Sequence, residues 1–500
     1  MTTTSIGVQE LRKRIGEKAK ADPQHRFWGL YAHVWKLDVL GEAYRLAKAN
    51  SGAPGVDGVT FEQLEEQGVE QLLETLSREL QEKNYVPLPC RQVNIPKEGG
   101  KVRGLKIPAI RDRVVQGSVR LILEPIFEAD FQPGSFGYRP SRTAHQALER
   151  VQAGLNKRLH QVIDLDLKSY FDTVRHDLLL AKLAQRVRDD DLLWLCKSIL
   201  KAGGKCGLPQ GSVIGPLWAN VFLNEIDRML EQAQVATKQG EYDVVSYTRF
   251  ADDLVVLVSS HPRAAHWAPK VEQRIREELV KLDLIVNEEK SRVVNFGAGE
   301  PFSFLGYTFR WVDQRKTPGK KMVLCRPQKK KRAQLLRRLS ETISKCLHIP
   351  VVEVVQRIVN PIVRGWVNYF RWGNAGRDLS FVAWQVDMKV RRFASRQRPK
   401  RRGGRAWTTW SDQEIYGTWK LFHDYGVTWR SEPKKQSHIN LPTDSTGNAG
   451  WRKSHVRCDG REAETEPWLG LRHRRSPERG RPTATPRACG HRAASRPNCS

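Results

Sequence analysis

The stretch RFADDLVVLV, residues 249–258, places two adjacent aspartates, Asp252 and Asp253, between an aromatic side chain and a run of branched apolar residues. Apolar residues on both sides predict a hairpin tip that emerges from a buried sheet. Two-residue turns favour Asn-Gly or Asp-Gly over Asp-Asp, so turn propensity does not explain the pair. A divalent cation would explain it, because a cation cancels the repulsion between carboxylates that share a site.

The alternative is a solvated turn or the start of a helix, and the chain contains such a case. Three aspartates at residues 189–191 precede an amphipathic run, and we expect them to cap a helix and fill its first turn. They lack the apolar residues that flank Asp252 and Asp253 on both sides. The two acidic clusters are therefore expected to differ in role.

A third carboxylate strengthens the cation hypothesis. In VIDLDLKSYFDTVRHD, residues 162–177, Asp164 and Asp166 lie two apart and therefore on the same face of a predicted strand. Aspartates on a central strand and at the tip of a neighbouring hairpin suit a two-metal phosphoryl-transfer site. We take Asp166 as the ligand and give Asp164 a supporting role, because Asp164 could instead pair with Lys168 or Arg175.

Composition limits the kind of partner. The 500 residues are 39 % hydrophobic and carry a formal charge of +29, which favours a polyanion, nucleic acid before membrane. No run of eighteen apolar residues occurs and the start lacks the apolar core of a secretory signal, so we expect a soluble, intracellular protein. The eight cysteines are scattered without a Cys-x-x-Cys pair, which predicts reduced thiols and no structural zinc.

The order of periodic segments predicts an α+β fold. The chain changes in texture at residue 326, where Leu335, Leu339, Ile343 and Leu347 recur every four residues on one face of a basic helix. Residues 326–405 hold 21 Lys and Arg against 4 Asp and Glu, about +17 of the total charge, which favours a docking surface. Strand-like runs occupy residues 92–96, 160–167, 243–250, 254–258 and 291–296, and helical runs include 189–201 and 271–282.

Nine sequence blocks, in order from about residue 53 to residue 422, resemble those of the reverse transcriptases encoded by group II introns. They include GAPGVDGVT, VNIPKEGGKVRGLKIPAIRDRVVQ, PIFEADFQPGSFGYRPSRTAHQAL, DLDLKSYFDTVRHDLL, GLPQGSVIGPLWANVFLNEID and YTRFADDLVVLV. LIVNEEKSRVV, FSFLGYTF and VNPIVRGWVNYFRW follow, the last resembling the thumb or maturase signature. The resemblance implies a right-hand polymerase with fingers and palm, an α-helical thumb and a basic carboxyl-terminal segment.

The resemblance also implies roles for individual residues. Asp166, Asp252 and Asp253 match the catalytic carboxylates that hold two Mg²⁺ ions, with Asp166 and Asp252 as the foremost direct ligands. Tyr170 matches an aromatic residue that abuts the sugar and selects deoxynucleotides. Without the family, Tyr170 would be an ordinary core residue. The other residues matched to nucleotide binding are Lys97, Arg103, Gln210, Gly211 and Lys290.

The basic thumb and the aromatic segment after it are expected to grip folded RNA and DNA through phosphates and stacking. The residues assigned to this contact are Arg364, Trp366, Tyr369, Arg391, Arg392, Arg401, Arg402, Trp407 and Trp410.

Three departures from the family pattern matter. Phe250 stands where the family usually has Tyr; its ring is kept and the lost hydroxyl is not a metal ligand, so we expect altered fidelity or rate. Ser212 and Gly215 stand where Gly and Ser are commoner, which bears on nucleotide positioning. The carboxyl end lacks the paired cysteines of an appended endonuclease, so nicked, replication-fork or single-stranded DNA is the expected target.

We expect two activities on one chain: RNA-directed DNA polymerisation, and maturase support of intron splicing and retrohoming. The alternatives are a reverse transcriptase of a retron, a diversity-generating element or a phage-defence system, and a splicing-only maturase. The thumb signature argues against the retron, diversity-generating and phage-defence enzymes. Expected partners are group II intron RNA, a DNA target or primer and deoxynucleoside triphosphates, with a possible homodimer, no membrane, and a place beside the nucleoid in a bacterial cytoplasm.

Five segments follow from these assignments. We expect an amino-terminal extension with the first conserved loop at 1–85, fingers and palm at 86–315, and the thumb at 326–400. A DNA-binding segment at 401–433 and a basic, disordered tail at 434–500 complete the chain.

Overall fold

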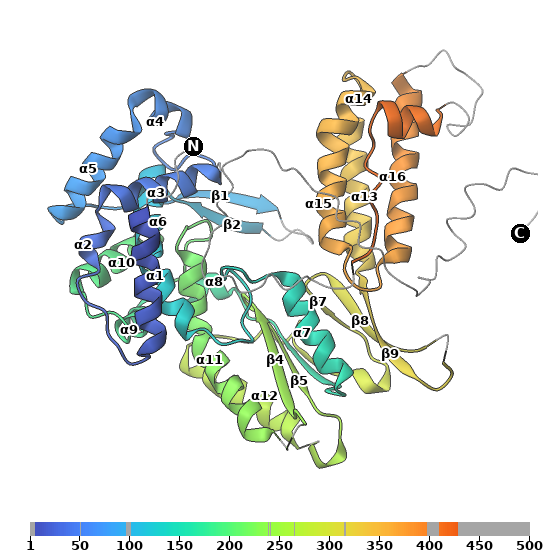
Figure 1. Cartoon of the computed structure of the whole chain (residues 1–500), viewed down its shortest axis with the longest axis horizontal. Helices are drawn as coiled ribbons and strands as arrows, with labels where there is room; N and C mark the ends of the chain where they lie inside the picture. Colours follow the sequence, from blue (N-terminus) through green and yellow to red (C-terminus); the bar gives the residue numbers. More distant parts are fainter. Residues whose placement is uncertain are drawn as a thin grey trace, which may run out of the picture. The chain divides into compact units, whose positions relative to one another are not determined.

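The structure of the 500-residue chain is a computed structural model. It describes residues 6–50, 52–96, 102–238, 240, 242–264, 266–314, 317–397 and 410–428, all within one compact unit, Met1–Ala449 (Figure 1). Helices and antiparallel strands are mixed along the chain, which confirms the α+β class.

Helices dominate the first part of the chain. The long helix α6 (Ile110–Asp130) is buried along most of its length and packs against the helices that precede it. Arg12 anchors the first of these to α6 through an ion pair of 2.7 Å with Glu124. The preceding helices are α1 (Ile6–Ala21), α2 (Tyr31–Val34), α3 (Leu37–Ala49), α4 (Phe61–Gln67) and α5 (Val69–Gln81).

A separate hairpin joins these helices to α6. Strands β1 (Arg91–Pro96) and β2 (Val102–Ile107) pair antiparallel, with Pro96 opposite Val102 at the open end. Lys97 lies outside the described residues, as does the rest of the connecting loop at 97–101. Arg103 is described only by its backbone, which lies in β2 opposite Ile95.

The central sheet carries the aspartates that the sequence predicts as the active site. Its strands are β3 (Gln161–Leu165), β4 (Val245–Phe250), β5 (Asp253–Val258) and β6 (Arg292–Asn295), in the order β4-β5-β3-β6 and all antiparallel. These bounds confirm four of the predicted strand-like runs. Both faces of the sheet are buried, which explains why LVVLV reads as a continuous apolar run.

Helices surround this sheet and connect its strands. Helix α11 packs on β4 on the side of the larger core, and α7 contacts both β4 and β5. Asp189 caps α10 by accepting from the Leu192 amide at 3.0 Å, which confirms the capping role predicted for that aspartate run. The helices are α7 (Ala144–Asn156), α8 (Tyr170–Thr173), α9 (His176–Ala184), α10 (Asp190–Ala202), α11 (Gly215–Thr237) and α12 (Trp267–Lys281).

A second sheet was not predicted as strands. It contains β7 (Phe302–Phe304), β8 (Tyr307–Asp313) and β9 (Lys321–Pro327) in sequential antiparallel order. Phe302 and Phe309 stack in its core with ring centroids 5.0 Å apart. The block FSFLGYTF is therefore a β-hairpin whose alternate aromatic residues fill a core.

Three helical segments follow the second sheet and form the thumb. The first is α13 (Lys329–Ser344), in which Leu335, Leu339 and Ile343 are buried as the four-residue spacing predicts. Leu347 lies beyond the end of this helix and is exposed, so the predicted stripe is one turn too long. The second segment joins α14 (Val351–Val354), a π-helical turn (Val355–Val359) and α15 (Asn360–Phe370), and the third is α16 (Gly376–Gln397).

The described part of the segment after the thumb, residues 410–428, packs into the core of these three helices. Asn360 holds it, because its amide donates to the Lys420 carbonyl at 2.8 Å and accepts from the Phe422 amide at 2.8 Å. Trp410, Ile415 and Trp419 belong to the same apolar core. Residues 410–428 are thus part of the thumb, whereas 401–409 and the predicted tail at 434–500 lie outside the described residues.

Among the described helices, none has the length and apolar character needed to cross a membrane.

One close approach gives a test of the packing. A Cβ on Gly134 would lie 2.3 Å from Cζ of the buried Tyr247 ring, whereas a Cβ on Gly365 in α15 would meet nothing within 4 Å. We predict that Gly134→Ala lowers the free energy of unfolding by about 1–3 kcal/mol through overpacking. Gly365→Ala should raise it by about 0.5–1 kcal/mol, because alanine favours a helix interior over glycine. Urea unfolding measures both, and equal effects of the two changes would contradict this packing.

Candidate active site

The hairpin tip between β4 and β5 presents the paired aspartates. Phe250 pairs with Asp253, so Ala251 and Asp252 form a two-residue turn and Asp253 opens β5, which confirms the predicted hairpin. Ala251 adopts a left-handed conformation with φ of +58°. Such a conformation costs about 1–2 kcal/mol for a residue with a Cβ, so the surrounding structure must enforce it.

Asp166 joins the pair because of strand register. It follows β3 directly, and Leu165 of β3 pairs with Leu254 of β5, so the ends of the two strands adjoin. The Asp166 carboxylate accepts from Lys290 Nζ and Asn287 Nδ2, each at 2.9 Å. Its backbone also accepts from the Asn287 amide at 2.8 Å, so the loop before β6 fixes both ends of this residue.

The aspartates lie close enough for their charges to shift one another's pKa values. Burial, followed by the negative charges of Asp252, Asp166 and Asp164, raises the pKa of Asp253 to about 7, while Lys290 opposes the shift. Burial also raises the pKa of Asp164 to about 6, against Arg292 at 3.5 Å. Protein atoms surround the Asp253 carboxyl group, but the residue as a whole keeps contact with solvent, so solvent screens part of this repulsion and ions can reach the carboxylates.

Carboxylate oxygens are the donors that Mg²⁺ prefers, and clustered negative charge is what a cation would compensate. Among the described residues, no three acidic, histidine or cysteine side chains converge closely enough to hold a metal as they stand. Asp166 Oδ2 already accepts from Lys290 and Asn287. The donor chemistry fits a divalent cation, and a cation bound at this oxygen would have to displace these two partners.

The role expected for Tyr170 is corrected by its burial. Its side chain is 2 % exposed and its hydroxyl donates to the Ala219 carbonyl of α11 at 2.7 Å, so it cannot abut a sugar. The adjacent ring of Phe171 is half-buried and makes an edge contact with Tyr138, which is 47 % exposed. Sequence reasoning missed Phe171, although two rings in succession were the available signal.

The loop that contains Gln210 and Gly211 lies against β2. The Lys106 amide donates to the Gln210 carbonyl at 2.9 Å. Gly211 has φ of +123°, and a Cβ there would lie 2.9 Å from the Lys106 carbonyl oxygen. The close approach that this glycine permits is therefore to the β1–β2 hairpin. Ser212, one of the departures from the family pattern, ties the loop to α6 by donating to Gln116 Oε1 at 3.0 Å.

Several thumb residues expected to touch nucleic acid serve the fold instead. Arg391 is buried, pairs with Asp387 at 3.0 Å and also reaches Asp412 at 2.5 Å. The Trp410 ring is buried and its indole nitrogen donates to Ser395 Oγ at 3.1 Å. These two assignments are corrected, because a buried side chain cannot contact a nucleic acid.

Tyr369 is likewise used in the junction of thumb and palm. Its hydroxyl donates to the Leu305 carbonyl at 2.8 Å, and its own carbonyl receives the Tyr307 hydroxyl at 2.7 Å. Burial and the charge of Asp253 raise the pKa of the Tyr369 hydroxyl. The Tyr369 side chain is only half-buried, so its expected RNA contact stays a prediction beside this structural role.

The remaining assignments stay predictions. Arg364 and Arg392 are exposed, and Arg364 lies over the Phe422 ring at 5.8 Å. Trp366 is half-buried against Phe370, with ring centroids 4.6 Å apart. Arg401, Arg402 and Trp407 lie outside the described residues.

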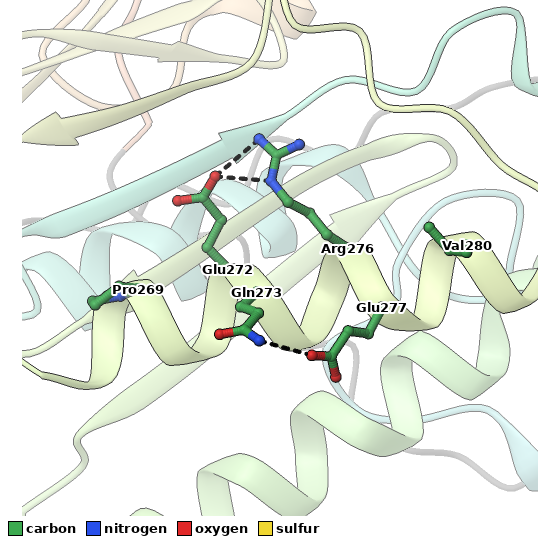
Figure 2. A pocket seen from close by; sticks show the side chains of 6 residues that line it. All are labelled: Pro269, Glu272, Gln273, Arg276, Glu277 and Val280. Atoms are coloured by element: carbon green, nitrogen blue, oxygen red, sulfur yellow. Dashed lines mark hydrogen bonds and ion pairs between the residues drawn. The ribbon is translucent and has the colours of Figure 1, made fainter.

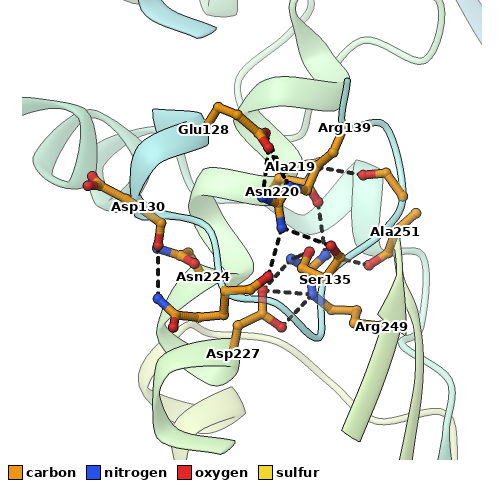
Figure 3. A network of polar contacts seen from close by, with 12 residues as sticks. Glu128, Asp130, Ser135, Arg139, Ala219, Asn220, Asn224, Asp227, Arg249 and Ala251 are labelled. Carbon is orange, nitrogen blue, oxygen red and sulfur yellow. Dashed lines mark hydrogen bonds and ion pairs between the residues drawn. The ribbon is translucent and has the colours of Figure 1, made fainter. Parts of the chain in front are cut away.

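A buried charged group behind the hairpin was also missed. Arg249 is 2 % exposed and forms an ion pair with the fully buried Asp227 of α11 (Figure 3). Its guanidinium also donates to the Ala251 carbonyl at 2.8 Å. An arginine inside a predicted strand next to the apolar run was the signal in the sequence, because such a charge requires a partner when it is buried.

A shallow pocket on α12 does not belong to this site. It is lined by side chains of that one helix, which pair along it through Glu272 with Arg276 and Gln273 with Glu277 (Figure 2). None of its lining residues is among the candidate site residues.

The chain matches two protein-family models. Residues 95–309 match the family model described as reverse transcriptase (RNA-dependent DNA polymerase), and residues 332–411 match the group II intron, maturase-specific domain. The chain is similar to Protein YkfC of Escherichia coli strain K12, with 34 % identity over 65 % of this chain and 94 % of that protein.

It is also similar to group II intron-encoded protein LtrA of Lactococcus lactis subsp. cremoris, with 25 % identity over 60 % of this chain and 59 % of LtrA. The match thus spans about three fifths of the length of LtrA. Among solved structures, telomerase from Candida albicans matches 62 % of this chain and 57 % of its own, with 13 % identity and a TM-score of 0.39.

The chain belongs to the family of group II intron reverse transcriptases and maturases. Its class is that of RNA-directed DNA polymerases, nucleotidyltransferases that typically use a divalent metal, and its maturase-specific domain indicates an RNA partner.

The raised carboxyl pKa values predict an unusual pH dependence in metal-free protein. A raised folded-state pKa stabilises the fold below the unfolded value near 4, and this contribution is lost as pH rises through 6 for Asp164 and 7 for Asp253. Asp253→Asn removes one repelling charge. In chelator at pH 8 the variant should therefore melt a few degrees higher than wild type, and the difference should shrink at pH 5.

Thermal unfolding between pH 5 and pH 8 measures this effect. Asp190→Asn is the matched control, since Asp190 is an exposed aspartate in the first turn of α10 and should show no such gain. Parallel curves for wild type and Asp253→Asn would show that the acids do not repel one another in the folded chain.

Proposed function

We propose that this chain copies RNA into DNA at a centre formed by Asp166, Asp252 and Asp253. The observation that carries the proposal is the register of β3 and β5, which brings three carboxylates to one end of a buried sheet. The raised pKa of Asp253 supports it, because the cluster holds negative charge in excess of its neighbouring cations. Phosphoryl transfer requires such a site for cations.

Asp166 and Asp252 would hold two Mg²⁺ ions as direct ligands, with Asp253 completing the cluster. When bound, such ions activate a 3′-hydroxyl and stabilise the charge on the leaving pyrophosphate. Lys290 now neutralises Asp166, and its side chain is 62 % exposed, so it is free to turn toward a triphosphate once Asp166 binds a cation. Lys97, Arg103, Gln210 and Gly211 remain proposed contacts of the incoming nucleotide.

Selection of the sugar is assigned to Phe171 in place of Tyr170. Phe171 follows a residue whose ring is locked in the core, and its own ring is only half-buried. The edge contact with Tyr138 limits how far the Phe171 ring can turn away. A rigid ring beside the sugar would exclude a 2′-hydroxyl by its volume alone.

The second activity is binding of group II intron RNA, which supports splicing and retrohoming. The maturase-specific domain supports this intron-encoded function over that of a retron or a phage-defence reverse transcriptase. Exposed cations on the thumb, including Arg364 and Arg392, suit phosphate contacts, and Trp366, Arg401, Arg402 and Trp407 remain proposed partners. The proposal includes DNA as primer or target and deoxynucleotides as substrates. It also includes a homodimer and a location beside the nucleoid in a bacterial cytoplasm.

Primer extension on an RNA template with Mg²⁺ tests the polymerase centre. We predict that Asp252→Asn abolishes DNA synthesis and leaves intron RNA binding and splicing support unchanged, since a lost ligand weakens metals and not the RNA grip. Asp190→Asn should extend primers like wild type. Equal loss of DNA synthesis and RNA binding in folded Asp252→Asn would contradict the separation of the two activities. A wild type that binds RNA but makes no DNA would mean that Phe250 or its surroundings have inactivated the polymerase centre.

Sugar selection separates the two neighbouring rings. Phe171→Ala should raise ribonucleotide incorporation relative to deoxynucleotide by roughly 10- to 100-fold, because a steric contact is removed. Tyr170→Phe should leave the ratio unchanged and cost about 1 kcal/mol of stability through the lost hydrogen bond to Ala219. Competition between the two nucleotide types, with urea unfolding, measures both. Relaxed selection in Tyr170→Phe alone would restore the assignment to Tyr170.

A further inference from the structure

The turn that presents Asp252 does not hold its shape by local preference. Ala251 has φ of +58°, a region that favours glycine, so a residue with a Cβ is strained at this position of the two-residue turn. Groups outside the turn must therefore fix the direction in which Asp252 points.

Arg249 supplies the fixing contact. Its Nη1 donates to the Ala251 carbonyl at 2.8 Å and to Asn220 Oδ1 at 3.0 Å, while Nε donates to Asp227 at 2.9 Å. One planar guanidinium thus ties the turn to helix α11, and Figure 3 shows it between the Asp227 carboxylate and the Ala251 carbonyl. Both charged partners are at most 2 % exposed, so water cannot substitute for these bonds.

A second layer holds the same turn from its other side. The Arg249 amide donates to the Gly134 carbonyl at 2.8 Å, and the Phe136 amide donates back to the Arg249 carbonyl at 2.9 Å. Asn220 Nδ2 donates to the Gly137 carbonyl at 2.8 Å. A Cβ on Gly137 would lie 2.3 Å from the Ala251 nitrogen, so this loop lies directly against the turn. Asn220 therefore joins the guanidinium to the loop that closes over the hairpin.

Stability alone does not account for this arrangement. A buried arginine–aspartate pair can often be replaced by apolar residues of similar volume without loss of stability. Apolar residues could fill the same space, but they could not donate to the Ala251 carbonyl. The contact with the turn is thus the one feature of the pair that an apolar core cannot reproduce.

We propose that Arg249 and Asp227 are positioning residues for the cation-binding carboxylates of the polymerase centre. Asp227 fixes the guanidinium, and the guanidinium fixes the Ala251 carbonyl, so that Asp252 faces Asp166 across the end of the sheet. The inference rests on the proposed function, and it adds to that function a buried pair that touches neither substrate nor metal. Loss of the guanidinium fork should weaken metal binding and lower kcat while the KM for deoxynucleotides stays near its wild-type value.

Arg249→Lys is the first variant. It keeps the positive charge beside Asp227 and loses the planar fork, which reaches Asp227 through Nε and Nη2 and Ala251 through Nη1 at the same time. The affinity of the full chain for Mn²⁺, without nucleotide, can be measured from the electron paramagnetic resonance signal of the free ion. We expect this affinity to fall about tenfold. Primer extension should need correspondingly more Mg²⁺, with intron RNA binding unchanged.

Arg186→Lys is the matched control. Arg186 is also buried, lies 3.2 Å from an Asp130 carboxylate oxygen and donates to the Ala19 carbonyl at 3.1 Å, but none of these partners belongs to the aspartate hairpin. This variant should lose stability and keep wild-type Mn²⁺ affinity. Mn²⁺ affinity that falls equally in both variants would overturn the proposal.

A double variant, Arg249→Met with Asp227→Leu, decides the case if Arg249→Lys does not fold. It should regain stability as a buried apolar pair and still bind Mn²⁺ about tenfold more weakly. Wild-type Mn²⁺ affinity in either Arg249 variant overturns the positioning role. A wild type that binds Mn²⁺ but makes no DNA would refute the proposed polymerase function, and the variants would still test the positioning role. A wild type that binds no Mn²⁺ would refute both proposals.

Discussion

Repulsion between carboxylates is the constraint on which the rest of the structure depends. Asp166, Asp252 and Asp253 meet at one end of a sheet whose two faces are covered by apolar cores, so they cannot move apart without breaking the strand register. Lys290 and Asn287 contact Asp166, Arg292 lies near the neighbouring Asp164, and the pKa of Asp253 is still raised to about 7. Such an arrangement costs stability in the free protein, and the proposed binding of a cation would offset that cost.

The supporting structure is arranged around this constraint. Helix α11 contributes Asp227 and Asn220 beneath the hairpin, and the loop at 134–139 closes against it through glycines that leave no room for a side chain. Tyr369 of the thumb is bonded to the palm through both its hydroxyl and its carbonyl. A few polar contacts thus join the candidate carboxylates to the core beneath them, and the thumb to the palm.

Sequence patterns predicted the strands and the aspartates of the site, but they did not predict the polar contacts that hold these elements in place. Asp252 and Asp253 were identifiable because like charges interrupt an apolar run, and Asp166 because it stands two residues from Asp164. Tyr170 and Arg391 were assigned wrongly, since spacing and charge do not report whether a side chain points to solvent or into a core. Arg249 was missed because its partner Asp227 lies 22 residues away on another element, a pairing that only tertiary structure reveals. The sheet β7–β9 was missed as strands because its short aromatic runs were read only as a family block.

The most direct test of the account is to locate Mn²⁺ by anomalous diffraction in crystals of the full chain soaked with the ion. The account predicts an anomalous peak in contact with carboxylate oxygens of Asp166 and Asp252, with Lys290 released from Asp166. A peak absent from this end of the sheet, with Lys290 still paired to Asp166 at saturating Mn²⁺, would contradict the claim that the clustered aspartates form a cation site.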